Sequence, residues 1–167
     1  TWRCCSSHAH GSGQREWGSV ALPSCHVTDT GDAGSEPVHK NVQRVIDAGH
    51  VRGLEVRPKR FPEGAKTAID AANAIGVGVG QIVKSLIFGV DGEIVLAYVS
   101  GSNQLDEKKL ALAAGGLKCQ RVDADQVREA TGFPIGGVPP FGHTTHLRVF
   151  IDPDLLQYDE VWAAAGT

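Results

Sequence analysis

The sequence lacks the features that would tie the chain to a membrane, or to a nucleic acid through bulk charge. Its apolar runs all fall short of the roughly 20 residues that a membrane helix needs, and its N-terminus has no apolar segment of the signal-peptide kind. Its formal charge is −3, so any contact with a nucleic acid must be local. We therefore expect no membrane partner and a cytoplasmic location.

Methionine is absent, and cysteine is scarce and unevenly placed. Because the chain starts at Thr1 without Met, we do not expect this to be the natural start of a reading frame. Three of the four cysteines lie in the first 25 residues, near several histidines. A metal site there is the weaker alternative, because the spacing matches no standard zinc pattern. We interpret residues 1–37 as a disordered or vector-derived leader, and Cys119 as a small core residue suited to a reducing compartment.

The remaining residues, 38–167, are predicted to form one domain with a real core, since 41% of the sequence is apolar. Apolar spacing from Val38 to Ile46 predicts a helix that ends at Gly49. Thr67 and Asp70 fit a capping box that begins a second helix, whose small inner residues imply close packing. A third helix is expected after Leu105, with Leu112 among its apolar positions. A fourth is expected after Asp123, which caps it.

Two long apolar segments are predicted to be central strands, residues 81–88 and 93–100, joined by a hairpin turn at Asp91-Gly92. Shorter strands are expected at 54–56, 117–122, 147–152 and 158–164. Because helices and strands are interspersed while the hairpin requires antiparallel pairing, we predict an α/β class. The sheet should be mixed, curved or barrel-like and largely antiparallel, with helices around it.

Lys84 is unusual because it lies inside an apolar strand, where an unpaired charge is costly. One interpretation is a lysine that extends to the sheet edge. The other is a cation on a pocket floor that holds an anionic or carbonyl group. Ser85 is adjacent, but neighbours on a strand point to opposite faces, so the two do not form a Ser-Lys catalytic pair.

The segment from Thr131 to His143 holds four glycines and three prolines. Proline stiffens such a loop, and glycine lets a ligand approach the main chain. Its N–H groups could converge on an oxyanion or a phosphate. The alternative is a tight connection between two elements, anchored by apolar side chains.

Several separate motifs resemble the YbaK/prolyl-tRNA-synthetase-associated editing domain family. They are Ile82–Ile87, Gly101 with Leu105-Asp106 and Lys108–Ala111, the Thr131–Gly142 loop, Ile151-Asp152 and Val161–Gly166. Their order and spacing make the resemblance specific from about Val38 onward. It implies a trans-acting aminoacyl-tRNA deacylase that hydrolyses the ester of tRNA(Pro) mischarged with Cys or Ala. No metal and no cofactor are expected.

By this resemblance Lys84 anchors the substrate, while Gly136, Gly137 and Val138 contact the carbonyl or oxyanion. Asp152 takes the substrate's α-amino group or pairs with Lys84; alternatively it only caps the segment at Pro153. The family's cysteine-selective members often carry an early tyrosine, and none precedes Tyr98. The full set of expected substrate contacts is Ser85, Gly101, Phe133, Pro140, Phe141, Gly142, His143 and Asp152.

The expected partner is the aminoacylated 3′ end of a tRNA, with prolyl-tRNA synthetase as a further candidate. Basic residues would give a modest, salt-dependent contact with tRNA phosphates. The candidates are Arg57, Lys59, Arg60, Lys66, Lys108 and Lys109. The competing hypothesis is a non-catalytic module of the same fold that binds the tRNA end or an amino acid.

Overall fold

A computed structural model describes residues 3–5, 24–28, 38–59 and 67–166. Its centre is the hairpin of β3 (Val83–Val90) and β4 (Glu93–Ser100), which pair antiparallel along their full length. Asp91 and Gly92 form the turn with φ of 48° and 93°. Positive φ at both positions is typical of the tight turns that match strand twist. The predicted hairpin is confirmed.

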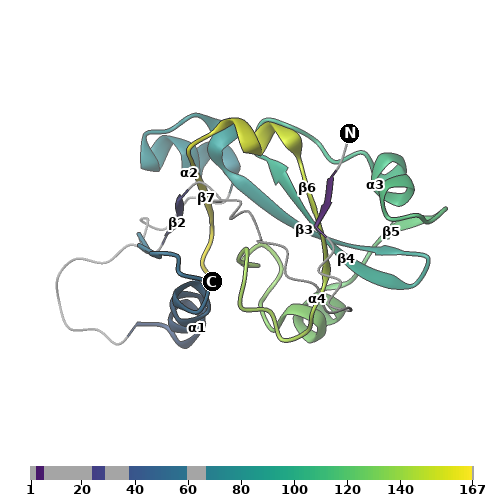
Figure 1. The fold of residues 1–167 in the computed structure, drawn as a ribbon, viewed down its shortest axis with the longest axis horizontal. Coiled ribbons are helices and arrows are strands. Elements are labelled where there is room, and N and C mark those ends of the chain that lie inside the picture. Colours follow the sequence, from purple (N-terminus) through teal and green to yellow (C-terminus); the bar gives the residue numbers. More distant parts are fainter. Residues whose placement is uncertain (1–2, 6–23, 29–37, 60–66, 167) are drawn as a thin grey trace, which may run out of the picture.

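The main sheet has the strand order β1-β6-β4-β3-β5 (Figure 1). It adds β1 (Arg3–Cys5), β5 (Cys119–Arg121) and β6 (Arg148–Ile151) to the hairpin. Only the β4–β6 pair is parallel among the pairs of this sheet. β7 (Glu160–Ala164) meets the start of β3 through a bridge between Ile82 and Trp162. The mixed, largely antiparallel sheet of an α/β fold is thus confirmed.

Two segments of the expected leader pair with strands of the domain, β1 in the main sheet and β2 (Ser24–Thr28) with β7 in a separate two-stranded sheet. β1 runs antiparallel to β6, and β2 runs parallel to β7. The interpretation of residues 1–37 as lying outside the fold therefore does not hold for these two segments. The rest of that stretch lies outside the described residues, and the domain boundary near Val38 stays a prediction.

Helices pack on both faces of the sheet (Figure 1). α1 (Lys40–His50) and α4 (Ala124–Thr131) contribute Val42, Val45 and Val127 to a core with Leu96 of β4. α3 (Glu107–Ala113) packs Leu110 against the opposite face. α2 (Ala68–Ile75) and two short 3₁₀ helices, η1 (Val79–Gln81) and η2 (Pro153–Gln157), flank the end where β3 begins and β4 ends. None of the helices in the described part is long and apolar enough to cross a bilayer.

The predicted helix ends are confirmed where the signals are local. Thr67 and Asp70 form the expected capping box of α2, and Gly76 ends that helix with φ 84°. Asp123 caps α4 and Gly132 ends it with φ 76°. The side chains at these ends satisfy backbone N–H groups that a helix leaves without partners.

Four local predictions are wrong. Residues 54–56 form no strand, although Val56 is buried against α1. Val38 and Leu112, expected to face the core, are 50% and 74% exposed. The strand expected from Leu117 begins only at Cys119, because the N–H groups of Leu117 and Lys118 are donated to the Asp91 carboxylate at 2.8 and 2.9 Å.

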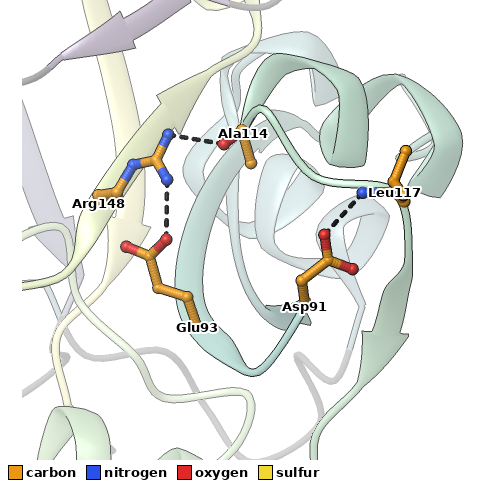
Figure 2. Close-up of polar contacts among 5 residues, drawn as sticks. All are labelled: Asp91, Glu93, Ala114, Leu117 and Arg148. Atoms are coloured by element: carbon orange, nitrogen blue, oxygen red, sulfur yellow. Dashed lines mark hydrogen bonds and ion pairs between the residues drawn. The ribbon is translucent and has the colours of Figure 1, made fainter.

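Polar contacts join the hairpin tip to its neighbours (Figure 2). Asp91 accepts the N–H groups of Leu117 and Lys118, and these two hydrogen bonds lower the pKa of the Asp91 carboxyl. Arg148 of β6 donates to Glu93 at 2.8 Å and to the carbonyl of Ala114 at 3.0 Å. The end of α3 is thereby fixed to β6 and, through Arg148, to β4, and segment 117–118 is fixed to the hairpin turn.

Candidate functional site

Lys84 lies on the face of β3 that carries α3, opposite Val99 of β4 in the register. Its ammonium donates to the carbonyl oxygens of Asn103 and Gly101, in the turn that follows β4. Burial lowers the pKa of Lys84, and the nearby Asp152 carboxylate opposes that shift. The side chain therefore lies at the end of the sheet, half-buried, with its charge held by turn carbonyls.

Asp152 follows β6 and is only 6% exposed. Its Oδ2 accepts the Ser100 N–H at 3.1 Å and the Asn103 side-chain amide at 2.9 Å. Its Oδ1 accepts the Asp154 N–H at 3.1 Å, which caps η2. The capping role considered for Asp152 is confirmed, and the same carboxylate fixes the β4–α3 turn that holds Lys84.

Gly101 lies where the backbone of this turn approaches η1. Its N–H donates to the Ile82 carbonyl at 2.7 Å. A Cβ added at Gly101 would lie 2.2 Å from the carbonyl oxygen of Val79. No larger residue fits there without moving the backbone, so packing alone accounts for glycine at this position. Its expected substrate contact stays a prediction.

The segment from Thr131 to His143, here called the Gly/Pro loop, covers the other face of the sheet. Phe133, Val138 and Phe141 are buried in the core beneath α1 and α4. The Gly137 N–H donates to the Pro134 carbonyl at 3.0 Å, and Gly136 has φ 85°. This is a tight turn with glycine at the position that needs positive φ. Of the three expected oxyanion donors, Gly137 is therefore already used within the loop.

Side chains from three directions hold the carbonyl oxygens of the Gly/Pro loop. Tyr98 of β4 donates to the Pro140 carbonyl at 2.5 Å, and Nε2 of His143 lies 2.8 Å from the Pro139 carbonyl oxygen. Arg44 of α1 donates to the carbonyls of both Thr131 and Gly142. By contrast, the N–H groups of Gly136 and Val138 have no acceptor among the described residues. The loop carbonyls are thus bound by protein side chains. Gly136 is exposed, so its N–H remains available, whereas Val138 is buried.

Burial is the main reason that the pKa of His143 is lowered, and its contact with the Pro139 carbonyl opposes the shift. The ring of His143 also packs edge-on against Phe133, with centroids 6.3 Å apart. At neutral pH the imidazole is therefore uncharged and is part of the loop's own packing.

The expected site residues thus form two groups, which lie on opposite faces of the sheet. Lys84, Gly101 and Asp152 form the first, and the Gly/Pro loop forms the second. Tyr98 joins them, because its backbone carbonyl accepts the Asp152 N–H at 2.8 Å while its hydroxyl holds Pro140. Ser85 lies opposite Tyr98 in the register, and its buried Oγ has no hydrogen-bond partner among the described residues. As predicted, Ser85 and Lys84 do not share a face.

Sequence reasoning missed Arg44, Tyr98 and Asn103. A hydroxyl inside the apolar strand 93–100 is a signal of the same kind as Lys84, and it could have identified Tyr98. Arg44 lies between two buried valines of α1, but a single arginine in an amphipathic helix carries no distinctive signal. No group of acidic, histidine or cysteine residues within the described part is placed to hold a metal ion.

A sequence model of the family described as "Aminoacyl-tRNA editing domain" matches residues 62–167. Protein YwhH of Bacillus subtilis, which is uncharacterized, is 34% identical over 108 residues, 64% of this chain and 68% of YwhH. EbsC of Enterococcus faecalis, described as "Putative Cys-tRNA(Pro)/Cys-tRNA(Cys) deacylase", is 30% identical over 101 residues, 60% of this chain and 62% of EbsC. Several proline–tRNA ligases also match, and the chain spans 16–18% of their length.

Among solved structures, a protein described as "a putative trans-editing enzyme for prolyl tRNA synthetase" has a TM-score of 0.70 with this chain. It is 44% identical, and the match covers 78% of this chain and 83% of that one. The two proteins therefore share a fold across the described domain.

Proposed function

Because the chain belongs to the aminoacyl-tRNA editing domain family, we propose that it acts in trans on tRNA(Pro) mischarged with Cys or Ala. It would hydrolyse the ester that joins the amino acid to the tRNA 3′ end. Two similarities support this substrate: the 44% identity to the trans-editing protein, and the 30% identity to EbsC. Such an activity answers a physical need, since binding alone discriminates poorly between small side chains.

The observation that carries the proposal is the arrangement of the Gly/Pro loop. An aminoacyl ester needs a positioned water and stabilisation of its oxyanion more than it needs a nucleophile. The loop's carbonyls are bound by Arg44, Tyr98 and His143. The N–H groups of Gly136 and Val138 are without acceptors among the described residues. We assign the exposed Gly136 N–H to the substrate carbonyl, with Gly137 holding the turn. The expected contact of the buried Val138 N–H stays a prediction.

Lys84 is proposed to anchor the substrate electrostatically. An ammonium has three N–H donors, and the carbonyls of Gly101 and Asn103 take two of them. One donor is then left for a hydroxyl or a carbonyl of the aminoacylated adenosine. Burial strengthens such an interaction because it removes competing water.

Asp152 is proposed to receive the α-amino group of the amino acid. A carboxylate offers about four acceptor positions, and Asp152 uses three of them for Ser100, Asn103 and Asp154. The remaining lone pair and the negative charge suit a positively charged amine. The other expected contacts, including Ser85, Phe133, Phe141 and Gly142, stay predictions.

The tRNA contact is proposed to begin at the basic segment after Val56. Lys59 lies over the Trp162 ring at 4.9 Å, which places this segment beside β7. Arg57 is paired with Glu55 at 2.8 Å, so its charge is partly compensated. Arg60 and Lys66 lie outside the described residues. Prolyl-tRNA synthetase is a proposed partner, and the cytoplasm is the proposed location.

The test is to incubate the protein with tRNA(Pro) charged separately with Ala, Cys, Ser and Pro, and to follow ester loss. We expect one mischarged species to be lost well above its spontaneous rate while Pro-tRNA(Pro) is spared. If every ester decays at the spontaneous rate although the folded protein binds the charged tRNA, the enzyme hypothesis is wrong. A binding module would then be the better description.

A further inference from the structure

Arg44 joins the two ends of the Gly/Pro loop. Its Nε donates to the Gly142 carbonyl at 2.8 Å, and its Nη2 donates to the Thr131 carbonyl at 2.9 Å. The same guanidinium lies 4.0 Å from the centroid of the Phe133 ring. One side chain of α1 therefore contacts the loop at its first residue, at its end and at a buried aromatic between them.

The chemistry of this contact fits arginine and not lysine. A guanidinium is a planar fork with several donors, and it can stack on a ring while donating in its own plane. The loop leaves room for that plane at Gly132, where an added Cβ would lie 2.6 Å from Nη2 of Arg44. A lysine ammonium could replace one of the two hydrogen bonds but not the whole set.

Holding the carbonyls also sets the direction of the loop's donors. The C=O and N–H of a trans peptide point in opposite directions. When Arg44 binds the Gly142 carbonyl, the N–H of His143 is turned away from α1. When Tyr98 binds the Pro140 carbonyl, the N–H of Phe141 is turned away from β4. The two side chains thus fix the direction of the N–H groups of Phe141 and His143, and with them the C-terminal part of the loop.

We infer that Arg44 is a positioning residue for ester hydrolysis, which acts by fixing the orientation of the Gly/Pro loop. This inference rests on the proposed function, because it assigns the loop to the substrate carbonyl. Arg44 does not itself touch the reacting atoms. Its loss should therefore lower the rate of the chemical step more than it weakens tRNA binding.

The test compares the full chain with Arg44→Ala, Arg44→Lys and a control, Arg128→Ala. Arg128 is an exposed arginine of the neighbouring helix α4. Hydrogen exchange of residues 131–143 reports the loop directly and needs no substrate. We expect faster exchange in both Arg44 variants but not in the control. We also expect kcat to fall by about 100-fold, the order that follows a misplacement of about 1 Å, with KM changed far less.

Added methylguanidinium, at concentrations too low to unfold the protein, should restore part of the Arg44→Ala rate. Circular dichroism identifies any variant that fails to fold, in which case Arg44→Lys carries the test. Unchanged loop exchange in the folded variants would overturn the inference. Faster exchange with an unchanged kcat would overturn it as well. If the wild-type protein hydrolyses no ester, the proposed function fails, and the exchange result still decides whether Arg44 fixes the loop.

Discussion

At Gly101 the main chain passes so close to η1 that the structure depends on the absence of a side chain. The nearest atom to an added Cβ would be a backbone carbonyl oxygen at 2.2 Å, which cannot rotate away. Gly78, in the same region, has ordinary backbone angles, and an added Cβ would lie 3.7 Å from the end of a glutamine side chain. The two glycines thus differ in the room available for a Cβ atom.

We predict that Gly101→Ala lowers the free energy of unfolding by about 1–3 kcal/mol, as overpacking typically does. Gly78→Ala should leave it unchanged or raise it slightly, because the unfolded chain loses entropy. Urea unfolding of both variants measures the difference. Equal stability of the two variants would show that the turn adjusts without cost.

His143 makes the stability of the loop depend on pH. Burial lowers its pKa in the fold, so below about 6.5, the usual value for histidine, the unfolded chain takes up a proton more readily than the folded chain. Stability from this group is complete above pH 6.5 and declines as the pH falls toward the lowered value. Glutamine is neutral throughout and retains a donor for Pro139.

We therefore predict that His143→Gln loses less stability than the wild type between pH 7 and pH 5. The measurement is urea unfolding of both proteins at the two pH values. A parallel loss in the two proteins would mean that His143 does not contribute to this pH dependence.

At the scale of elements, the tip of the β3–β4 hairpin organises the segment that follows α3. Asp91 has positive φ and also accepts the N–H groups of Leu117 and Lys118. Asparagine tolerates the same backbone angles, so Asp91→Asn removes the charge with little change to the turn. Alanine removes the acceptor and fits the turn poorly.

We predict that Asp91→Ala lowers the melting temperature more than Asp91→Asn does, and that both fall below the wild type at pH 7. Because the pKa of Asp91 is lowered in the fold, its contribution is present above the ordinary value of 3.8 and is lost as the pH falls through the lowered value. The difference in melting temperature between the wild type and Asp91→Asn should therefore disappear in acid. A difference that persists there would contradict the assignment.

Elements whose signals are local could be predicted from the sequence. The capping box at Thr67, the Asp91-Gly92 turn and the glycines that end α2 and α4 act within a few residues of themselves. The strand expected at 54–56 could not be judged in this way, because a strand needs a partner elsewhere in the chain. Leu117 was misplaced for a related reason, since its N–H is bound by a carboxylate 26 residues away.

Site residues likewise could be predicted where their signal is local and not where it depends on distant partners. Lys84 was found because a charge in an apolar strand is anomalous by itself, and the Gly/Pro loop was found by composition. Arg44 was not found, because its two carbonyl partners lie 98 and 87 residues further along the chain. Whether Gly137 has a free N–H also depended on the turn that the loop adopts.

At the scale of the whole molecule, two clusters on opposite faces of one hairpin are joined through Tyr98. One holds the cation Lys84 against turn carbonyls, and the other presents loop N–H groups. Ester hydrolysis requires both clusters, whereas the packing of the core requires only the second. The side chain of Lys84 should therefore matter more for activity than for stability.

The most direct test is the single-turnover rate of ester loss from mischarged tRNA(Pro), compared for the wild type, Lys84→Met and Lys118→Met. Methionine keeps the length and apolar stem of lysine, and Lys118 is an exposed control. We predict that Lys84→Met loses hydrolysis while its melting temperature stays close to that of the wild type, and that Lys118→Met is unaffected. Full activity in a folded Lys84→Met protein would contradict the account.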